Sequence, residues 1–364
     1  MKQLSVLIKP ASSLCNMRCR YCFYADVSEQ REVASYGIMS DEVRHSLILR
    51  AKESAAASVA FAFQGGEPTL AGLSFFRSFV NDVKETLSPT VKVSYSMQTN
   101  GLLLDDDFCR FLKEHSFLIG LSLDGYRENH NYMRLDSAGK DTFGKTLATA
   151  ERLRRFGVDF NILTVVTSPL AKRATKLWQF YQKNGFDFVQ LIPCLAPLSE
   201  NRQDEWALTA RGYASFLKEL FPLWVDALVK ENYISIRLFD NLVRKAYGQM
   251  PEMCGMCGVC SPQFVIEADG SVYPCDFYVL DEYRCGNVCE DSFDAILASD
   301  AMQHFLKPSL PDACASCRLA SFCRGGCKRY RSLYLSEEGY CPYADFLLSC
   351  EGDLRRAGRF VFGR

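Results

Sequence analysis

Short apolar runs and amphipathic stretches alternate along the first two thirds of the chain. From residue 4 to about residue 235, six apolar runs with strand-like composition alternate with helical patterns. This composition and length are typical of buried strands. The predicted strands are Val6–Lys9, Val59–Gln64, Val91–Thr99, Leu118–Leu123, Phe160–Val166 and Phe188–Ile192.

Between these runs, apolar residues recur at three- and four-residue spacing, which predicts helices with one buried face. The predicted helices are Asp41–Ala56, Phe75–Leu87, Asp106–Glu114, Thr142–Phe156 and Lys172–Asn184, followed by a longer one over about Ala210–Glu231. Regular alternation of strand and helix indicates a parallel sheet. Because six repeats fall short of the eight that close a complete barrel, we expect an α/β fold: a partial, open (β/α)6 barrel with its site at the carboxyl ends of the strands.

The character of the sequence changes after residue 250. Periodic segments give way to short stretches punctuated by cysteine, glycine and proline, and 12 of the 17 cysteines lie there. This predicts a second domain that bound metal stabilises more than a large core does. We place the boundary near residue 240, with the barrel over residues 1–240 and a cysteine-rich domain over residues 241–364.

Composition and charge narrow the class of protein. The 42 Lys and Arg residues balance 43 Asp and Glu residues, so no net field favours nucleic acid or an anionic membrane as a partner. The amino-terminal apolar stretch is too short for a signal peptide, and no segment is long enough to span a membrane, so we expect a cytoplasmic protein. Because the cytosol keeps thiols reduced, the cysteines indicate metal or cluster ligation rather than disulfides. The four histidines are far apart in the sequence, which argues against a histidine-based metal site.

Three cysteines follow the first predicted strand. Cys15, Cys19 and Cys22 form a C-x3-C-x2-C arrangement. A four-iron cluster has four ligand positions, so three thiolates leave one iron open to a small molecule that chelates through an amine and a carboxylate, as S-adenosylmethionine can. The alternative is a zinc loop completed by a distant residue, although zinc loops usually present C-x2-C pairs.

This cysteine pattern, with Tyr21 in its aromatic position, resembles the signature of the radical S-adenosylmethionine (radical SAM) superfamily. The segment Gln64, Gly65, Gly66 and Glu67 at the end of the second strand resembles the GGE motif of that superfamily, in which missing side chains let the backbone approach the methionine amino group. A plain turn is the alternative reading of this segment. The resemblance further implies that Ser122, Arg134 and Leu195 contact the nucleoside; each could instead be an ordinary cap, surface or core residue.

The carboxy-terminal cysteines include the run C-x2-C-x5-C-x3-C over residues 314–327, which resembles the SPASM domain that carries two auxiliary four-iron clusters. By this resemblance, one cluster is held by Cys254, Cys260, Cys275 and Cys327, and the other by Cys314, Cys317, Cys323 and Cys341. Fully ligated clusters carry electrons rather than bind substrate. Two structural zinc sites are the alternative. Cys257 exceeds the pattern and could compete as a ligand, whereas Cys109, Cys194, Cys285, Cys289 and Cys350 are interpreted as small buried hydrophobes.

Several segments in both domains resemble anaerobic sulfatase-maturating enzymes, among them LIKPASSLCNMRCRYCFY, FAFQGGEPTLAG, QTNG, GLSLDG and DGSVYPCDFYVLD. Such enzymes oxidise a Cys or Ser within a Cys/Ser-x-Pro/Ala-x-Arg segment of a sulfatase to formylglycine. The resemblance implies three [4Fe-4S] clusters, S-adenosylmethionine, and Asp276 as the base that takes the thiol or hydroxyl proton. An exposed residue after a hairpin turn is the other reading of Asp276.

The partners implied by the resemblance are an unfolded or nascent sulfatase polypeptide and an electron donor such as flavodoxin or ferredoxin. A peptide-crosslinking radical enzyme that forms thioethers remains a second candidate, and a zinc or electron-carrier protein a third, although the third explains neither the GGE segment nor the six repeats. The sequence leaves open the choice between cysteine-type and serine-type substrates, the role of Cys257 and the oligomeric state.

Overall fold

The computed structural model describes residues 2–198, 204–337 and 339–363. It divides into two compact units, each built from separate stretches of the chain. Unit 1 comprises Met1–Ser122, Arg134–Phe160 and Ser261–Lys307, and unit 2 comprises Leu123–Met133, Asn161–Cys260 and Pro308–Arg364. These units interleave along the sequence, whereas the boundary near residue 240 divides it once and stays a prediction.

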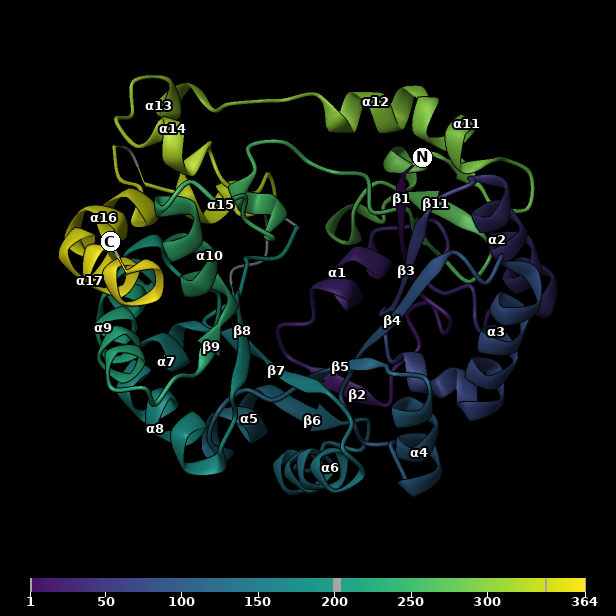
Figure 1. Ribbon diagram of the computed structural model, residues 1–364, viewed down its shortest axis with the longest axis horizontal. Helices are drawn as coiled ribbons and strands as arrows, with labels where there is room; N and C mark the ends of the chain where they lie inside the picture. The colour runs from purple at the N-terminus through teal and green to yellow at the C-terminus, as the bar shows by residue number, and fades with distance from the viewer. Residues whose placement is uncertain (1, 199–203, 338, 364) are drawn as a thin grey trace. The chain divides into compact units, whose positions relative to one another are not determined.

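Unit 1 is built on parallel strands that neighbour one another in chain order (Figure 1). They are β1 (Gln3–Ile8), β3 (Ser58–Phe63), β4 (Lys92–Thr99) and β5 (Leu118–Ser122). Along β1 and β3, every second side chain is buried, because successive side chains of a strand point to opposite faces of the sheet. Ile8 pairs with Phe63 and Phe63 with Met97, so the carboxyl ends of these strands lie at one edge.

The helices that connect these strands, and one that follows the last of them along the chain, cover one face of the sheet (Figure 1). They are η1 (Pro68–Ala71), α2 (Asp41–Glu53), α3 (Gly72–Thr86), α4 (Asp106–Glu114) and α6 (Phe143–Phe156). The side chains of Ser40 and Asp105 accept hydrogen bonds at the amino ends of α2 and α4, and left-handed Gly157 ends α6, as expected for helix caps.

The segment after residue 261 extends the sheet of unit 1. Strand β10 (Val265–Ile266) pairs in parallel with β1, and β11 (Ser271–Tyr273) and β12 (Gly286–Asn287) follow in antiparallel pairing. The elements η3 (Asp276–Tyr278), η4 (Asp281–Tyr283), α11 (Phe293–Ala298) and α12 (Asp300–Leu306) complete this segment. The pairing of β10 with β1 brings part of the cysteine-rich region beside the first strand.

Unit 2 carries the strands β7 (Phe160–Val166), β8 (Phe188–Pro193) and β9 (Ser235–Ile236), which pair in parallel. Its helices up to residue 256 are α5 (Arg127–Met133), α7 (Ser168–Ala171), α8 (Ala174–Asn184), α9 (Ala210–Val229), α10 (Arg237–Ala246) and η2 (Cys254–Met256). Rings of Phe221, Trp224, Phe239 and Phe346 contact one another and form the aromatic core of this unit.

Short helices follow in the cysteine-rich end of unit 2. They are α13 (Asp312–Ala315), α14 (Ala320–Cys323), α15 (Arg331–Tyr334), α16 (Pro342–Ser349) and α17 (Glu351–Phe362). The sequence did not predict α16 and α17, which contact α9. In the described part of the chain, no helix combines the length and apolar character needed to cross a bilayer.

All six strands predicted from the sequence are present, five of them within one residue of their predicted ends, while β1 begins three residues earlier than predicted. The predicted helices correspond to α2, α3, α4, α6, α8 and α9. The sequence missed the small antiparallel pair of β2 (Met17–Cys19) with β6 (Arg134–Asp136) and the helix α1 (Phe23–Glu29). These short elements are stabilised by contacts between distant segments and carry little periodicity of their own.

Candidate active site and cluster ligands

The loop of Cys15, Cys19 and Cys22 lies in unit 1 between β1 and α1. The Cys15 sulfur accepts a hydrogen bond from the backbone N–H of Met17 at 3.4 Å. The Cys22 sulfur accepts one from Ala25 at 3.4 Å and so caps the amino end of α1. Backbone N–H groups directed at sulfur stabilise a thiolate and its cluster, so the local geometry suits iron ligation.

The thiol of Cys15 is held in its neutral form by its surroundings. Although Cys15 is exposed at the surface, partial desolvation of its sulfur raises the pKa of Cys15 to about 11, against the opposing effect of the Met17 N–H; the charge of Glu67 adds to the rise. A cation that binds such a thiol displaces its proton. Binding of a metal to Cys15 would therefore be accompanied by loss of the thiol proton.

The glycines of the GGE segment contact the segment that leads into this loop. The N–H of Gly66 donates to the carbonyl of Ser12 at 2.8 Å, and that of Glu67 donates to the carbonyl of Leu14 at 2.8 Å. A Cβ on Gly66 would lie 2.1 Å from the Leu14 oxygen, and Gly65 has a φ of +140°. The segment Ser12–Leu14 therefore packs so closely against Gly65 and Gly66 that only glycine fits at these two positions, whether or not a ligand also approaches them.

Glu67 points into the protein. Its carboxylate is 1% exposed and accepts hydrogen bonds from the N–H and hydroxyl of Thr69, the hydroxyl of Thr99 and the N–H of Asn100. The Asn100 amide in turn donates to the side-chain oxygen of Asn16 at 2.7 Å. Burial raises the pKa of Glu67, while these donors oppose the rise. The carboxylate thus links the ends of β3 and β4 to the cysteine loop.

Arg134 lies beside the cysteine loop. Its backbone pairs with Cys19 across β2 and β6, and its guanidinium donates to the Tyr21 hydroxyl at 2.8 Å. Ser122, also predicted to contact the nucleoside, is buried at the carboxyl end of β5. Leu195 follows β8 in unit 2 and is half-buried.

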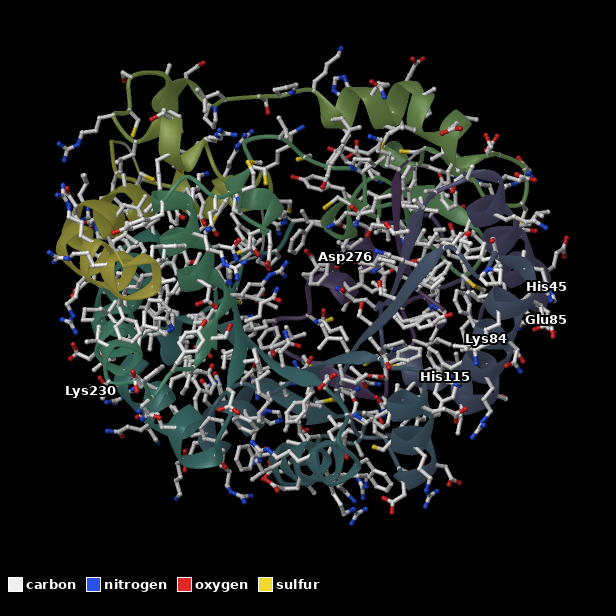
Figure 2. All side chains as sticks on the ribbon, viewed as in Figure 1. His45, Lys84, Glu85, His115, Lys230 and Asp276 are labelled. Atoms are coloured by element: carbon white, nitrogen blue, oxygen red, sulfur yellow. The ribbon has the colours of Figure 1, made fainter. Side chains whose placement is uncertain are left out.

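The β10–β11 hairpin carries Asp276 into unit 1, which also contains the loop of Cys15, Cys19 and Cys22. One carboxylate oxygen accepts from the Lys9 ammonium at 2.5 Å, and the other accepts from the Gln64 amide at 2.5 Å. In Figure 2, Asp276 lies on the side of the strands opposite to the helix that carries His45. Phe277 contacts Phe23 of α1 with ring centroids 5.0 Å apart, so Asp276 lies near the helix that follows the cysteine loop.

Sequence reasoning missed Lys9, Asn16 and Asn100. Lys9 is fully buried although it follows an apolar strand as the only charged residue in its run. A charge at the carboxyl end of a predicted barrel strand is a signal that could have singled it out. Gln64 was predicted to contact the cofactor, and the structure directs its amide to Asp276.

The first auxiliary set is divided between the units. In unit 2, Cys254 has Cys327 and Cys260 as electrostatic neighbours, and burial raises its pKa. A Cβ on Gly255 would lie 3.2 Å from the Cβ of Cys327, which places these segments in contact. Cys275, the fourth predicted ligand, lies in unit 1, directly before Asp276.

The second auxiliary set lies wholly in unit 2. Burial raises the pKa of Cys323 to about 11, and the charges of Cys341 and Cys314 add to the rise. Cys314 also has Cys341 and Cys317 as neighbours. All four predicted ligands are thus connected by electrostatic interactions.

The remaining cysteines behave differently. Cys257 donates to the carbonyls of Pro251 and Met253 at 3.7 and 3.6 Å. Five cysteines were predicted to be buried hydrophobic residues. Four of them are buried (Cys109, Cys194, Cys285 and Cys350), and Cys289 is half-buried. All 17 cysteines lie in the described residues, and none of them forms a disulfide. Among the described residues, no three Cys, His, Asp or Glu side chains gather closely enough to hold a single metal ion; a four-iron cluster is ligated at four separate corners.

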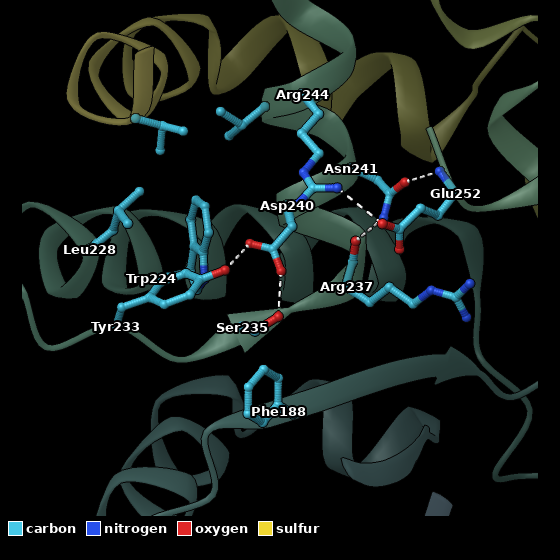
Figure 3. A pocket seen from close by; sticks show the side chains of 12 residues that line it. Phe188, Trp224, Leu228, Tyr233, Ser235, Arg237, Asp240, Asn241, Arg244 and Glu252 are labelled. Carbon is cyan, nitrogen blue, oxygen red and sulfur yellow. Dashed lines mark hydrogen bonds and ion pairs between the residues drawn. The ribbon is translucent and has the colours of Figure 1, made fainter. Parts of the chain in front are cut away.

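A pocket of about 470 Å³ in unit 2 lies between α9, β9 and α10 and is lined by none of the cysteines (Figure 3). Its charged side chains have polar partners within the protein. Asp240 accepts from the hydroxyls of Tyr233 and Ser235 at 2.6 Å each, and Arg244 pairs with Glu252 at 3.0 Å. Arg237, which also lines the pocket, donates to the side-chain oxygen of Gln190 at 3.2 Å.

Comparison with known proteins agrees with this assembly of motifs. A profile of the radical SAM superfamily matches residues 10–170, and a profile of the iron-sulfur cluster-binding SPASM domain matches residues 254–318. The chain is 44% identical over 332 residues to the cysteine-type anaerobic sulfatase-maturating enzyme of Clostridium novyi, covering 90% of this chain and 89% of that enzyme. It is 30% identical over 330 residues to the serine-type enzyme of Klebsiella aerogenes, covering 88% and 79%.

Solved structures show the same fold. Native anSMEcpe with bound AdoMet and Cp18Cys peptide superposes with a TM-score of 0.91 and 40% identity over 99% of both chains. Streptococcus suis SuiB, at 18% identity and a TM-score of 0.61, covers 94% of this chain and 75% of its own and shares the fold alone.

The fold and the cysteine segments define a radical SAM enzyme with a SPASM domain. This confirms the predicted fold class, a partial α/β barrel followed by a cysteine-rich SPASM domain. Within that class, the chain belongs to the family of anaerobic sulfatase-maturating enzymes.

Proposed function

We propose that this enzyme is of the cysteine type and oxidises the cysteine of a sulfatase Cys-x-Pro/Ala-x-Arg segment to formylglycine. The observation that carries the proposal is the 44% identity to cysteine-type enzymes over nine tenths of the chain, against 30% to a serine-type enzyme. The presence of a Cp18Cys peptide in the related anSMEcpe structure supports it.

The cysteine loop would hold a [4Fe-4S] cluster through Cys15, Cys19 and Cys22, with S-adenosylmethionine on the open iron. When bound, these groups supply a 5′-deoxyadenosyl radical that removes a hydrogen atom from the target Cβ. The backbone of Gly65 and Gly66, together with Ser122, Arg134 and Leu195, would contact S-adenosylmethionine. Tyr21 and Glu67 would support that site, since Tyr21 accepts from Arg134 and Glu67 joins the strand ends.

Asp276 would accept the proton of the target thiol. The residue is only 8% exposed. Little water therefore reaches the carboxylate to compete with it for the proton. Loss of a Cβ hydrogen atom, a thiol proton and one electron turns the cysteine into a thioaldehyde. Hydrolysis by water then releases hydrogen sulfide and leaves the aldehyde.

Two further [4Fe-4S] clusters would be available to accept the departing electron. Their ligands would be Cys254, Cys260, Cys275 and Cys327 for one, and Cys314, Cys317, Cys323 and Cys341 for the other. The proximity of the unit 2 members of each set supports these assignments. A cytoplasmic flavodoxin or ferredoxin would supply the electron that starts each cycle.

The proposal is tested with protein purified without oxygen. Metal analysis should find roughly twelve irons per chain, from three clusters of four. After addition of a reductant and S-adenosylmethionine, a Cys-x-Pro-x-Arg peptide should yield aldehyde, detected by its mass and by hydrazide trapping, faster than a matched Ser-x-Ala-x-Arg peptide. Zinc in place of iron, or faster oxidation of the serine peptide, contradicts the proposal.

The role of Asp276 is tested separately with Asp276→Asn. The amide cannot accept a proton from the thiol, so aldehyde formation should fall by about 10²-fold or more while iron content stays the same. Asp294→Asn, on the exposed face of α11, is the matched control. Full peptide oxidation by the Asp276 variant removes the base assignment and leaves the substrate assignment intact.

A further inference from the structure

Lys9 is a buried charge whose ammonium contacts Asp276. Its side chain is fully buried, whereas that of Asp276 is 11% exposed. The ammonium lies 2.5 Å from one Asp276 oxygen and 3.7 Å from the centre of the Tyr24 ring. A buried lysine is costly to fold unless its charge is compensated, and here one carboxylate and one aromatic face provide that compensation.

The position of Lys9 is fixed from several sides. Its N–H donates to the carbonyl of Ile266 at 2.8 Å, which aligns the end of β1 with the hairpin that carries Asp276. A Cβ on Gly65 would lie 3.3 Å from the Cβ and Cγ of Lys9, so the glycine leaves room for the lysine stem. The lysine side chain therefore has little freedom to turn away from Asp276.

A second buried pair holds the ring beneath the ammonium. The Tyr24 hydroxyl donates to the carboxylate of Glu267, and the Arg31 guanidinium donates to the same carboxylate at 2.7 Å. The side chains of Arg31 and Glu267 are both fully buried. A chain of contacts thus runs from Arg31 through Glu267, Tyr24 and Lys9 to Asp276.

We propose that Lys9 is a positioning residue for the reaction, which holds the Asp276 carboxylate in the orientation in which it receives the substrate proton. This inference rests on the proposed function, because it takes Asp276 as the base. Lys9 holds one oxygen and Gln64 holds the other at 2.5 Å. A carboxylate with both oxygens anchored keeps one rotamer, and such anchoring of a reacting group commonly contributes 10–100-fold in activity, as an order of magnitude.

The experiment compares Lys9→Met with Lys9→Arg in the full enzyme loaded with iron. The substrate is a Cys-x-Pro-x-Arg peptide deuterated at the target Cβ, and two products are measured together: deuterium in 5′-deoxyadenosine, and aldehyde. Lys9→Met should still transfer deuterium, yet yield about 10–100-fold less aldehyde per 5′-deoxyadenosine. Lys9→Arg keeps a cation against Asp276 and should recover most of this ratio. Lys92→Met, on the exposed start of β4, should behave as the unmodified enzyme.

A double-mutant cycle separates positioning from a general structural role. If Lys9 acts only through Asp276, adding Lys9→Met to Asp276→Asn causes no further loss of aldehyde per 5′-deoxyadenosine. If Lys9→Met fails to take up iron, Lys9→Gln, which retains a donor, replaces it in the same cycle.

The outcomes are distinct. A normal aldehyde ratio in Lys9→Met, or a loss that adds in full to that of Asp276→Asn, overturns the role of Lys9 and leaves the proposed function standing. Full activity of Asp276→Asn alone overturns the base assignment and this inference with it. A lowered ratio in Lys9→Met, with recovery in Lys9→Arg and no added loss in the double variant, supports it.

Discussion

Cys19 and Arg134 face each other across the antiparallel pair of β2 and β6. Since Arg134 also donates to the Tyr21 hydroxyl at 2.8 Å, one residue from beyond β5 stabilises the backbone and the aromatic side chain of the cysteine loop. The loop therefore depends on a segment more than 100 residues away in the chain.

We expect Arg134→Ala to weaken S-adenosylmethionine binding by about tenfold, because loss of a charged hydrogen bond costs about 1.5–3 kcal/mol and part of that is recovered by water. Equilibrium binding to the iron-loaded variant measures the effect. Arg110→Ala, at an exposed position of α4, is the control for loss of an arginine. Unchanged affinity in Arg134→Ala would show that the loop keeps its shape without the guanidinium.

Gly66→Ala should disrupt the loop, because its Cβ would lie 2.1 Å from the Leu14 oxygen. Relief of this clash requires the backbone to move, at a cost of about 1–3 kcal/mol or more. The variant should unfold at a lower denaturant concentration, and it should cleave S-adenosylmethionine reductively more slowly than the unmodified enzyme. Gly144→Ala, in α6 with no atom within 4 Å of the added Cβ, should be neutral or stabilising by up to about 1 kcal/mol. Equal behaviour of the two variants would contradict this reading.

Glu67→Ala should destabilise unit 1 by about 2–5 kcal/mol, because it leaves the buried N–H groups of Thr69 and Asn100 without their acceptor. Glu67→Gln keeps one oxygen acceptor and should lose less. Denaturant unfolding of the two variants gives the comparison, with Glu42→Ala on the exposed start of α2 as control. A Glu67→Ala variant as stable as the control would mean that water replaces the carboxylate.

We expect His115 to make the free energy of unfolding depend on pH. Burial and the neighbouring charge of Lys84 lower its pKa below 6.5, while Glu114 opposes the shift. The unfolded chain then binds the proton more readily than the folded protein, so stability is full above the unfolded pKa and falls as the pH drops through the folded pKa. His115→Gln should remove the part of the fall in the free energy of unfolding that begins as the pH drops below about 6.5. His45→Gln, at an exposed site of α2, is the control. If the free energy of unfolding of His115→Gln depends on pH as steeply as that of the unmodified enzyme, His115 is not the source of the pH dependence.

Removal of iron should loosen the end of unit 2 first. The helices α13, α14 and α15 are only four residues long each, too short to be stable without other support. Ligation of Cys314, Cys317, Cys323 and Cys341 would provide that support. Limited proteolysis of chelated and iron-loaded protein should therefore show new cleavage within residues 308–341 of the chelated form. Identical digestion patterns would mean that the apolar contacts of this segment suffice.

Local patterns predicted the repeating elements well. The alternating burial of β1 and β3 and the apolar faces of α2, α3 and α4 follow from periods of two and 3.6 residues, which adjacent side chains alone specify. The short elements β2, β6 and α1 were missed because their stability comes from partners elsewhere in the chain.

For the site, the sequence by itself determined which residue types are available: the thiols of Cys15, Cys19 and Cys22, the glycines before Glu67, and the carboxylate of Asp276. The tertiary structure decided their partners. Lys9 and Asp276 are 267 residues apart in the chain, and they meet only because β10 pairs with β1. The inward direction of Glu67 and the contact of Arg134 with the cysteine loop were decided in the same way. The physical reason is that periodicity records whether a side chain is buried, whereas its contacts depend on which distant segments pack together, a relation that no single stretch of sequence contains.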